Sequence, residues 1–301
     1  MRTKLLCSFC LVFLCLGTVS AQKTRPKPPT APKTVIFAVL NDGKLVEPIA
    51  YVQNKKLEQV ESAGETGDLK AFGSRYYSPK SVYTLIFGGA PDGTVAVGKS
   101  NIGSECGGNS ADVVSKPATA KLYDLVMGLG TNAKLDSRPG FRRRPTAGER
   151  SEIETFVRAR FQKEGVSEEV LKNLRYQNLT ALDLDHNGKP EFVGSYWVAP
   201  KADERRLLFF VAEEGKAGKY FFSLEDYSAV TPKDVMSGDV KDLDAGVGHE
   251  LLLDVLDIDN DGVDEIFTIG KAFEGNNYHV YKREGGKWNR VFETYNYRCA
   301  Y

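Results

Sequence analysis

The chain has 301 residues, of which 42% are hydrophobic and 27% charged, and its 40 lysines and arginines balance its 40 aspartates and glutamates. This composition is ordinary for a globular protein and excludes a collagen-like, coiled-coil or wholly disordered chain. Because the chain has no overall basic bias, we expect no nucleic-acid partner.

The first 21 residues predict a secretory signal peptide. The basic start MRTK precedes the apolar run LLCSFCLVFLCLG, and the small residues Val19 and Ala21 favour cleavage after Ala21. The apolar run is too short to cross a bilayer comfortably, so we expect no membrane span after the signal is removed. The expected location is secreted, periplasmic or at the cell surface.

Two cysteines remain after that cleavage, Cys106 and Cys299, and the predicted location is oxidising. The sequence leaves open whether they form a disulfide or stay as free thiols. A bond would tie the C-terminus to the first half of the chain, and closing so long a loop is worth about 3–5 kcal/mol in the chain-entropy model.

Composition divides the next part of the chain into three segments. Residues 22–34, QKTRPKPPTAPKT, are basic and rich in proline, which predicts a disordered tether. Residues 35–132 predict a β-rich N-terminal domain of unknown type, with hairpin turns expected at NDGK and at APD (90–92). Residues 133–145 are rich in Pro, Gly and Arg and are the expected linker.

Residues 146–174 predict a helical lead-in to the last part of the chain. Ile153, Val157 and Phe161 recur at helical spacing. Thr146 followed three residues later by Glu149 is the pattern of a capping box, which satisfies free N–H groups at the start of a helix.

Residues 175–301 contain an internal repeat. The segment LTALDLDHNGKPEFVGSYWVA matches LLDVLDIDNDGVDEIFTIGKAF, and in both copies the expected order is strand, acidic loop, strand, strand, turn, strand. We therefore expect a pair of four-stranded β-units in this part, and a mainly β fold with a few helices, α+β overall.

Both acidic loops have the pattern D-x-D-x-[DN]-G-x-x-E. Calcium takes six to eight hard oxygen ligands, which carboxylates at alternate positions of a tight turn supply. Lys189 and Val263 are expected to contribute backbone carbonyls. The alternative is a solvated acidic turn that binds no ion. The candidate metal ligands are Asp183, Asp185, Asn187, Lys189 and Glu191 in the first loop, and Asp257, Asp259, Asp261, Val263 and Glu265 in the second.

The residues after each loop separate this pattern from an EF-hand. Position 12, where an EF-hand carries a bidentate Glu, is Gly194 or Thr268, and the loop leads into a β-type sequence instead of a helix. The loops resemble those of FG-GAP/VCBS-type repeats and of the integrin alpha-subunit propeller. The resemblance covers roughly residues 175–296 and implies propeller-blade-like β-units with structural Ca²⁺. Two copies do not close a propeller, which needs at least four blades.

Two further motifs are attributed to chance. The string FGGAP at 87–91 lies far upstream of both acidic loops. The stretch GTVAVGKS at 93–100 matches the P-loop pattern, but its interior favours a strand, and the next residues, NIGSECGGNS, are a poor helix start. We expect no nucleotide. We found neither a G-x-S-x-G elbow nor a zinc-type histidine spacing in the sequence.

The sequence favours a non-catalytic, calcium-binding interaction or adhesion module with a protein or glycan partner at the surface. One alternative is a secreted hydrolase with structural calcium sites, whose active site would be a deep pocket with convergent polar groups away from the loops. Another is a carbohydrate-binding protein that uses aromatic side chains. The candidates for that role are Tyr196, Trp197, Tyr278 and Trp288.

Overall fold

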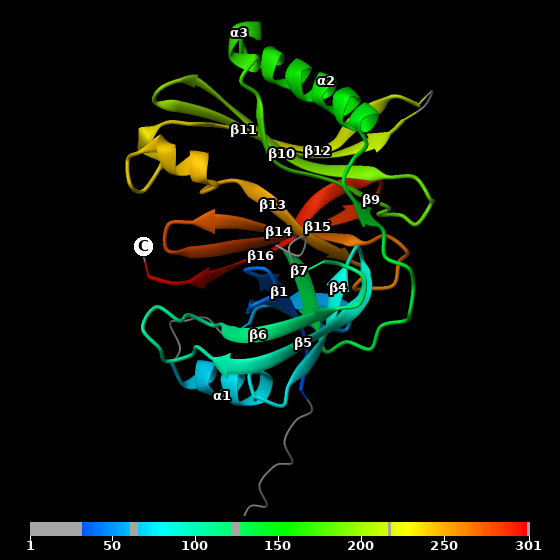
Figure 1. Cartoon of the computed structure of the whole chain (residues 1–301), viewed down its shortest axis with the longest axis vertical. Helices are drawn as coiled ribbons and strands as arrows, with labels where there is room; N and C mark the ends of the chain where they lie inside the picture. The colour runs from blue at the N-terminus through cyan, green and yellow to red at the C-terminus, as the bar shows by residue number, and fades with distance from the viewer. Residues whose placement is uncertain (1–31, 61–65, 122–126, 216–217, 300–301) are drawn as a thin grey trace, which may run out of the picture. The chain divides into compact units, whose positions relative to one another are not determined.

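β-Strands form most of the structure, a computed structural model that describes residues 32–60, 66–121, 127–215 and 218–299 (Figure 1). The signal peptide predicted at 1–21, and all but the end of the tether predicted at 22–34, lie outside the described residues. Residues Lys33–Tyr301 form one compact unit, and the linker predicted at 133–145 lies inside it.

The N-terminal part is a six-stranded antiparallel barrel. The strands have the order β1-β7-β4-β5-β6-β2, and β1 also pairs with β2, which closes the ring and leaves β3 paired outside it. Closure removes the free sheet edges at which strands of other chains could pair. The elements are β1 (Thr34–Leu40), β2 (Leu45–Gln53), β3 (Lys56–Glu58), α1 (Thr66–Tyr76), β4 (Val82–Phe87), β5 (Ala90–Ser100), β6 (Ala111–Pro117) and β7 (Gly128–Thr131).

Of the two hairpin turns predicted in this part of the chain, one is confirmed and the other is wrong. Asn41, Asp42 and Gly43 all have positive φ between β1 and β2, as the NDGK turn predicts. The turn expected at APD is wrong, because those residues begin β5 and the chain reverses at Gly88 and Gly89. The P-loop-like stretch also lies within β5, where no helix N-terminus is formed.

Helix α1 was not predicted from the sequence. Its residues Leu69, Phe72 and Tyr76 are buried, and Phe72 and Tyr76 pack into the same core as the barrel residue Phe37. The spacing of the three side chains is helical, so the signal was present. The helix covers the barrel on the side away from the C-terminal sheets (Figure 1).

The C-terminal part consists of two antiparallel sheets and their helices. One sheet has the order β12-β11-β10-β9-β8 and the other β13-β14-β15-β16. The elements are β8 (Arg142–Arg143), α2 (Ala147–Lys163), α3 (Glu168–Leu171), β9 (Arg175–Leu182), β10 (Glu191–Lys201), β11 (Glu204–Glu214), β12 (Tyr220–Val230), the 3-10 helices η2 (Pro232–Asp234) and η3 (Val240–Ala245), β13 (Glu250–Leu256), β14 (Glu265–Ala272), β15 (Gly275–Glu284) and β16 (Lys287–Tyr297).

The expected strand order is present in both copies, with one correction. The first sheet has five strands, because Arg142 and Arg143 of the expected linker pair with Leu182 and Ala181 of β9. The capping box at the start of α2 is confirmed, with Thr146 and Glu149 bonded reciprocally.

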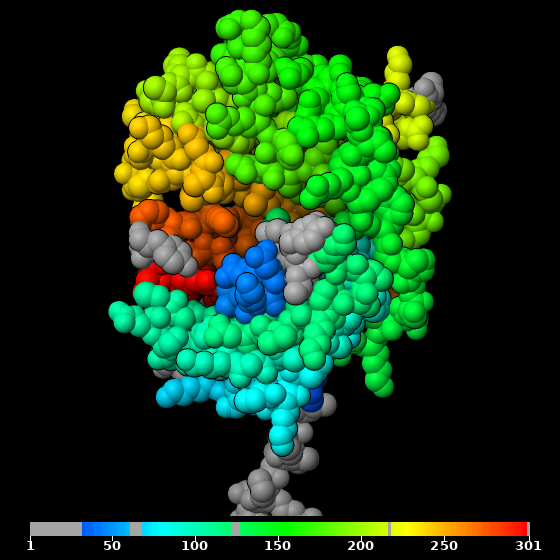
Figure 2. Space-filling view, viewed as in Figure 1, coloured from blue at the N-terminus to red at the C-terminus, as the bar shows by residue number. Residues whose placement is uncertain are grey.

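Apolar cores hold the layers together in the order barrel, four-stranded sheet, five-stranded sheet, α2 (Figures 1 and 2). Phe267 and Tyr278 pack against barrel residues on one face of the four-stranded sheet. Val255 and Trp288 pack against the five-stranded sheet on its other face. Strands β13 and β14 are therefore mostly buried, whereas most residues of the edge strand β16 are exposed.

The disulfide is formed between Cys106 and Cys299, which are 193 positions apart. It ties the end of the chain to the loop between β5 and β6. Beside it, the buried carboxylate of Glu47 accepts hydrogen bonds from Tyr278 and Asn276 and pairs with Arg298. Within the described residues, none of the helices has the length and apolarity needed to cross a membrane.

Candidate metal centres

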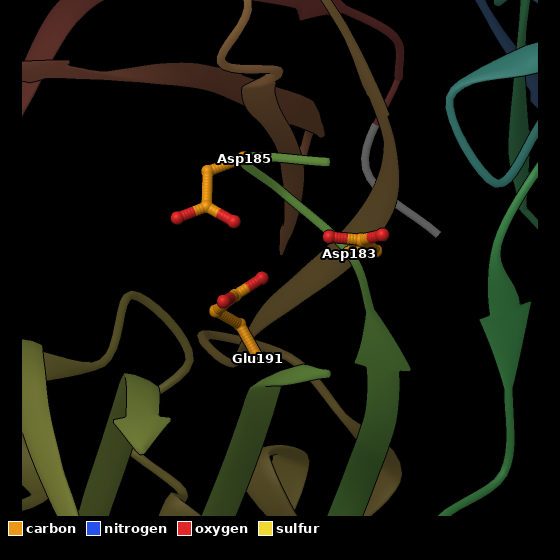
Figure 3. Close-up of side chains that lie close together, drawn as sticks. All are labelled: Asp183, Asp185 and Glu191. Carbon is orange, nitrogen blue, oxygen red and sulfur yellow. The ribbon is translucent and has the colours of Figure 1, made fainter. Parts of the chain in front are cut away.

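The first acidic loop brings three carboxylates together between β9 and β10. Asp183 lies just after the end of β9, Asp185 lies in the loop and Glu191 begins β10, and the carboxylates of Asp185 and Glu191 face one another (Figure 3). One oxygen of each of the three residues lies within 4.8 Å of the others. Three of the five predicted ligands of this loop therefore converge.

Side-chain to backbone hydrogen bonds shape this loop. The N–H of Gly188 donates to Asp183 Oδ2 at 3.1 Å, and the N–H of Asn187 donates to Asp185 Oδ1 at 3.3 Å. Asn187 Oδ1 accepts the N–H of Lys189 at 2.7 Å. Gly188 has a φ of 83°, which glycine adopts without steric cost. These bonds turn the chain sharply and direct the acidic side chains inward.

Glu191 is the buried member of the first cluster. Its side chain is 6% exposed, and one oxygen accepts the N–H of Leu184 at 2.7 Å. Burial, joined by the nearby carboxylates of Asp185, Glu213 and Asp183, raises the pKa of Glu191 to about 7 against the opposing hydrogen bond from Leu184. Without a cation, the folded protein therefore favours a proton on this group near neutral pH.

The donor set of the first loop could hold a metal ion. Asp183 Oδ1 is buried and, within the described residues, has no hydrogen-bond partner. A buried carboxylate oxygen without a donor is costly. Calcium prefers hard oxygen ligands, and here such an oxygen lies beside two further carboxylates. Asp183, Asp185 and Glu191 are thus the residues that would hold the ion.

The second loop, between β13 and β14, repeats this geometry. Asp257, Asp259 and Glu265 place one oxygen each within 4.8 Å of one another. The N–H of Gly262 donates to Asp257 Oδ2 at 3.1 Å, and the N–H of Ile258 donates to Glu265 Oε2 at 2.9 Å. Both bonds have counterparts in the first loop, so the sequence repeat corresponds to a structural repeat.

Lys282 distinguishes the second loop from the first. Its Nζ lies 2.6 Å from Asp259 Oδ2, 2.8 Å from Asp261 Oδ2 and 3.0 Å from Glu265 Oε1. Burial alone would lower the pKa of Lys282, but these hydrogen bonds outweigh it and raise the pKa. The second loop therefore contains its own cation, and a calcium ion fits there only if Lys282 moves away.

Strand register explains this difference. Tyr281 pairs with Ile266, and Ala212 pairs with Phe192. One residue further along each pair of strands, Lys282 of β15 lies opposite Glu265 of β14. In the other sheet, Glu213 of β11 occupies the corresponding position opposite Glu191 of β10. The same structural position thus carries an ammonium in one unit and a carboxylate in the other.

Two side chains of the four-stranded sheet hold the Glu213 carboxylate in place. It accepts a hydrogen bond from Arg283 at 2.8 Å and another from the Trp288 indole at 3.0 Å. Arg283 also approaches the first loop, but its Nη1 is 3.9 Å from Asp185 Oδ2, beyond hydrogen-bond distance.

The remaining predicted ligands lie outside the two three-residue clusters. Asn187 bonds the backbone of its own loop, and Asp261 accepts both the N–H of Val263 and the ammonium of Lys282. Lys189 directs its ammonium to Glu214 at 3.2 Å. The ligand roles assigned to the carbonyls of Lys189 and Val263 stay predictions.

The two loops touch each other, which the sequence did not predict. The N–H of Asp264 in the second loop donates to the carbonyl of Leu184 in the first at 2.8 Å. Arg138 joins the same contact, because it binds Asp264, His186 of the first loop and the carbonyl of Gly89. Gly89 belongs to FGGAP, so this string lies beside the loops in space although it is distant in sequence.

Comparisons of the chain with protein-family models, with curated proteins and with solved structures found no match.

Proposed function

We propose that this chain is a calcium-stabilised, non-catalytic interaction module of the FG-GAP/VCBS kind, secreted or displayed at a cell surface. In this proposal the two C-terminal sheets are propeller-blade-like units that present a surface to a protein or glycan. The observation that carries it is the repeated strand, acidic loop, strand arrangement with three converging carboxylates in each copy.

Calcium, when bound, supplies positive charge that offsets the carboxylates of the first loop. Asp183 lies at the end of one strand and Glu191 begins the next, so holding both fixes the junction between β9 and β10. The bond from Asp264 to Leu184 extends that order to the second loop. The expected role of the ion is therefore structural, because it stabilises the contact between the two sheets.

The described lining of one cavity offers no support for the hydrolase alternative. A cavity of about 880 Å³ lies away from the acidic clusters, and its lining includes Arg142, Arg150 and Tyr176. Its described lining contains no Asp, Glu, His, Cys or Ser, the residue types that most often supply nucleophiles and acid–base pairs. The hydrolase alternative expects convergent groups of those types in such a pocket.

The aromatic residues suggested for carbohydrate binding do not support that alternative. Tyr196 and Tyr278 are at most 1% exposed, and Trp197 and Trp288 are at most 5% exposed. These four side chains belong to the cores of the two sheets and present no surface to a sugar.

The proposal is tested by thermal unfolding in EDTA, in calcium and in magnesium. Wild-type protein should melt at a higher temperature in calcium, with a smaller shift in magnesium, which demands stricter octahedral geometry. The double variant Asp183→Asn with Asp185→Asn should lose the calcium shift. Asp203→Asn, at an exposed turn, is the matched control and should keep it. Identical melting of wild-type protein in EDTA and in calcium would refute the proposal.

A further inference from the structure

The cavity of about 880 Å³ is lined by several separate parts of the fold. Phe87 comes from the end of β4, Lys121 from the segment after β6, and Arg150 from α2. Another part of the wall comes from β9 and consists of Tyr176, Asn178, Leu179 and Thr180, and residues 142–145 complete the lining. Its volume is within the range of small-molecule sites, about 300–1,000 Å³.

The charge of this lining is one-sided. Five of the thirteen described lining residues are cationic, and none of these thirteen is acidic. A concave wall with charges of one sign concentrates its electric field in the cavity and attracts ligands of opposite charge. The cations are Lys121, Arg142, Arg143, Arg144 and Arg150.

Carboxylates outside the lining hold three of these guanidinium groups in place, those of Arg142, Arg143 and Arg150. Arg142 reaches Asp254 Oδ2 at 3.0 Å and the carbonyl of Leu253 at 2.7 Å through Nη1, and its guanidinium carbon lies 4.7 Å from the centre of the Phe87 ring. Arg143 makes a two-pronged pair with Glu149 at 2.7 and 2.8 Å. Groups held in this way lose little conformational entropy when a ligand binds.

Arg150 and Tyr176 form an accessible platform beside these groups. The guanidinium carbon of Arg150 lies 4.1 Å from the centre of the Tyr176 ring, and Arg150 uses Nε to bind Glu154 at 2.8 Å. The Tyr176 side chain is 48% exposed although it lies on a strand. An exposed ring beside a fixed cation suits a ligand that has both an organic body and an anionic group.

We propose that this cavity binds a small organic polyanion, a molecule that carries at least two carboxylate, sulfate or phosphate groups. Arginine forks match the geometry of all three groups. The cations come from separate segments of the chain, so a ligand needs more than one anionic group to engage them together. The site is distinct from the acidic loops, and the inference does not depend on calcium.

Isothermal titration calorimetry of the full chain tests this inference, with EDTA present so that metal chelation by a ligand does not imitate binding. The probes are citrate for carboxylates, inositol hexakisphosphate for phosphates, and a heparin-derived sulfated disaccharide. Inorganic phosphate and sulfate serve as single-anion probes. We expect saturable binding of at least one organic polyanion, weakened by added salt, and the tightest of the three identifies the anionic group.

Arg150→Gln should weaken that binding about tenfold, which corresponds to about 1.4 kcal/mol. Arg290→Gln removes an equally exposed arginine elsewhere and should leave the affinity unchanged; the two side chains are 44% and 48% exposed. Three results would each overturn the inference: no saturable binding of any organic polyanion, equal losses in both variants, or inorganic ions that bind as tightly as the organic probes.

Discussion

Replacing Lys282 by methionine tests whether this side chain takes the place of a metal ion in the second loop. Methionine keeps an unbranched apolar stem like that of lysine but lacks the ammonium, which lies 2.6–3.0 Å from Asp259, Asp261 and Glu265. Glu265 is only 1% exposed, so the variant leaves a buried carboxylate without its counter-charge.

The expected loss of stability is large for a single substitution. Removing one partner of a buried ion pair costs about 3–5 kcal/mol, and we take about 3 kcal/mol because the Lys282 side chain is 19% exposed. At about 2–4 °C per kcal/mol for a protein of this size, the melting temperature in EDTA should fall by about 6–12 °C. Lys287→Met, at an exposed position, is the control and should change it little.

Calcium should restore much of this loss, because the three carboxylates then form a site that resembles the first loop. A ligand at one hundred times its dissociation constant stabilises a protein by about 2.7 kcal/mol. Thermal unfolding measures the recovery, and calorimetry should count one calcium ion per wild-type chain and two per Lys282→Met chain. A variant as stable as wild type in EDTA, or a wild-type chain that binds two ions equally well, would show that our interpretation of Lys282 is incorrect.

Three other predictions concern pH, the disulfide and a buried ion pair. In the folded protein the pKa of Glu191 is raised to about 7, so its protonated side chain contributes its full stabilisation in EDTA below about pH 4.5. This contribution, up to about 3 kcal/mol, should be lost as the pH rises through 7. Denaturant titrations from pH 5 to 8 should show this fall, and Glu191→Gln should reduce it; equal slopes for both proteins would contradict it. Cys299→Ser should destabilise the chain by about 5 kcal/mol, because the bond to Cys106 closes a loop of 193 positions; unchanged unfolding after reduction of wild type would argue against this. Arg142→Met leaves the fully buried Asp254 unpaired and should cost about 3–5 kcal/mol in the same titrations, whereas an unaltered midpoint would mean that Asp254 is neutral.

The sequence by itself determined the features that depend on neighbours along the chain. The capping box of Thr146 and Glu149, the NDGK turn and the strand order of the repeat all rest on contacts within a few residues. The same is true of the convergence of Asp183, Asp185 and Glu191, because a tight turn between two paired strands is enough to bring them together.

Only the tertiary structure decided which charges face these loops. Lys282 reaches its carboxylates from the next strand, and Glu213 takes the corresponding position by strand register, so neither effect is visible in the loop sequence. Closure of the barrel, the bond between Cys106 and Cys299 and the meeting of five cations in one cavity also join distant segments. Such contacts depend on how sheets pack, and periodicity along one segment carries no information about the partner of that segment.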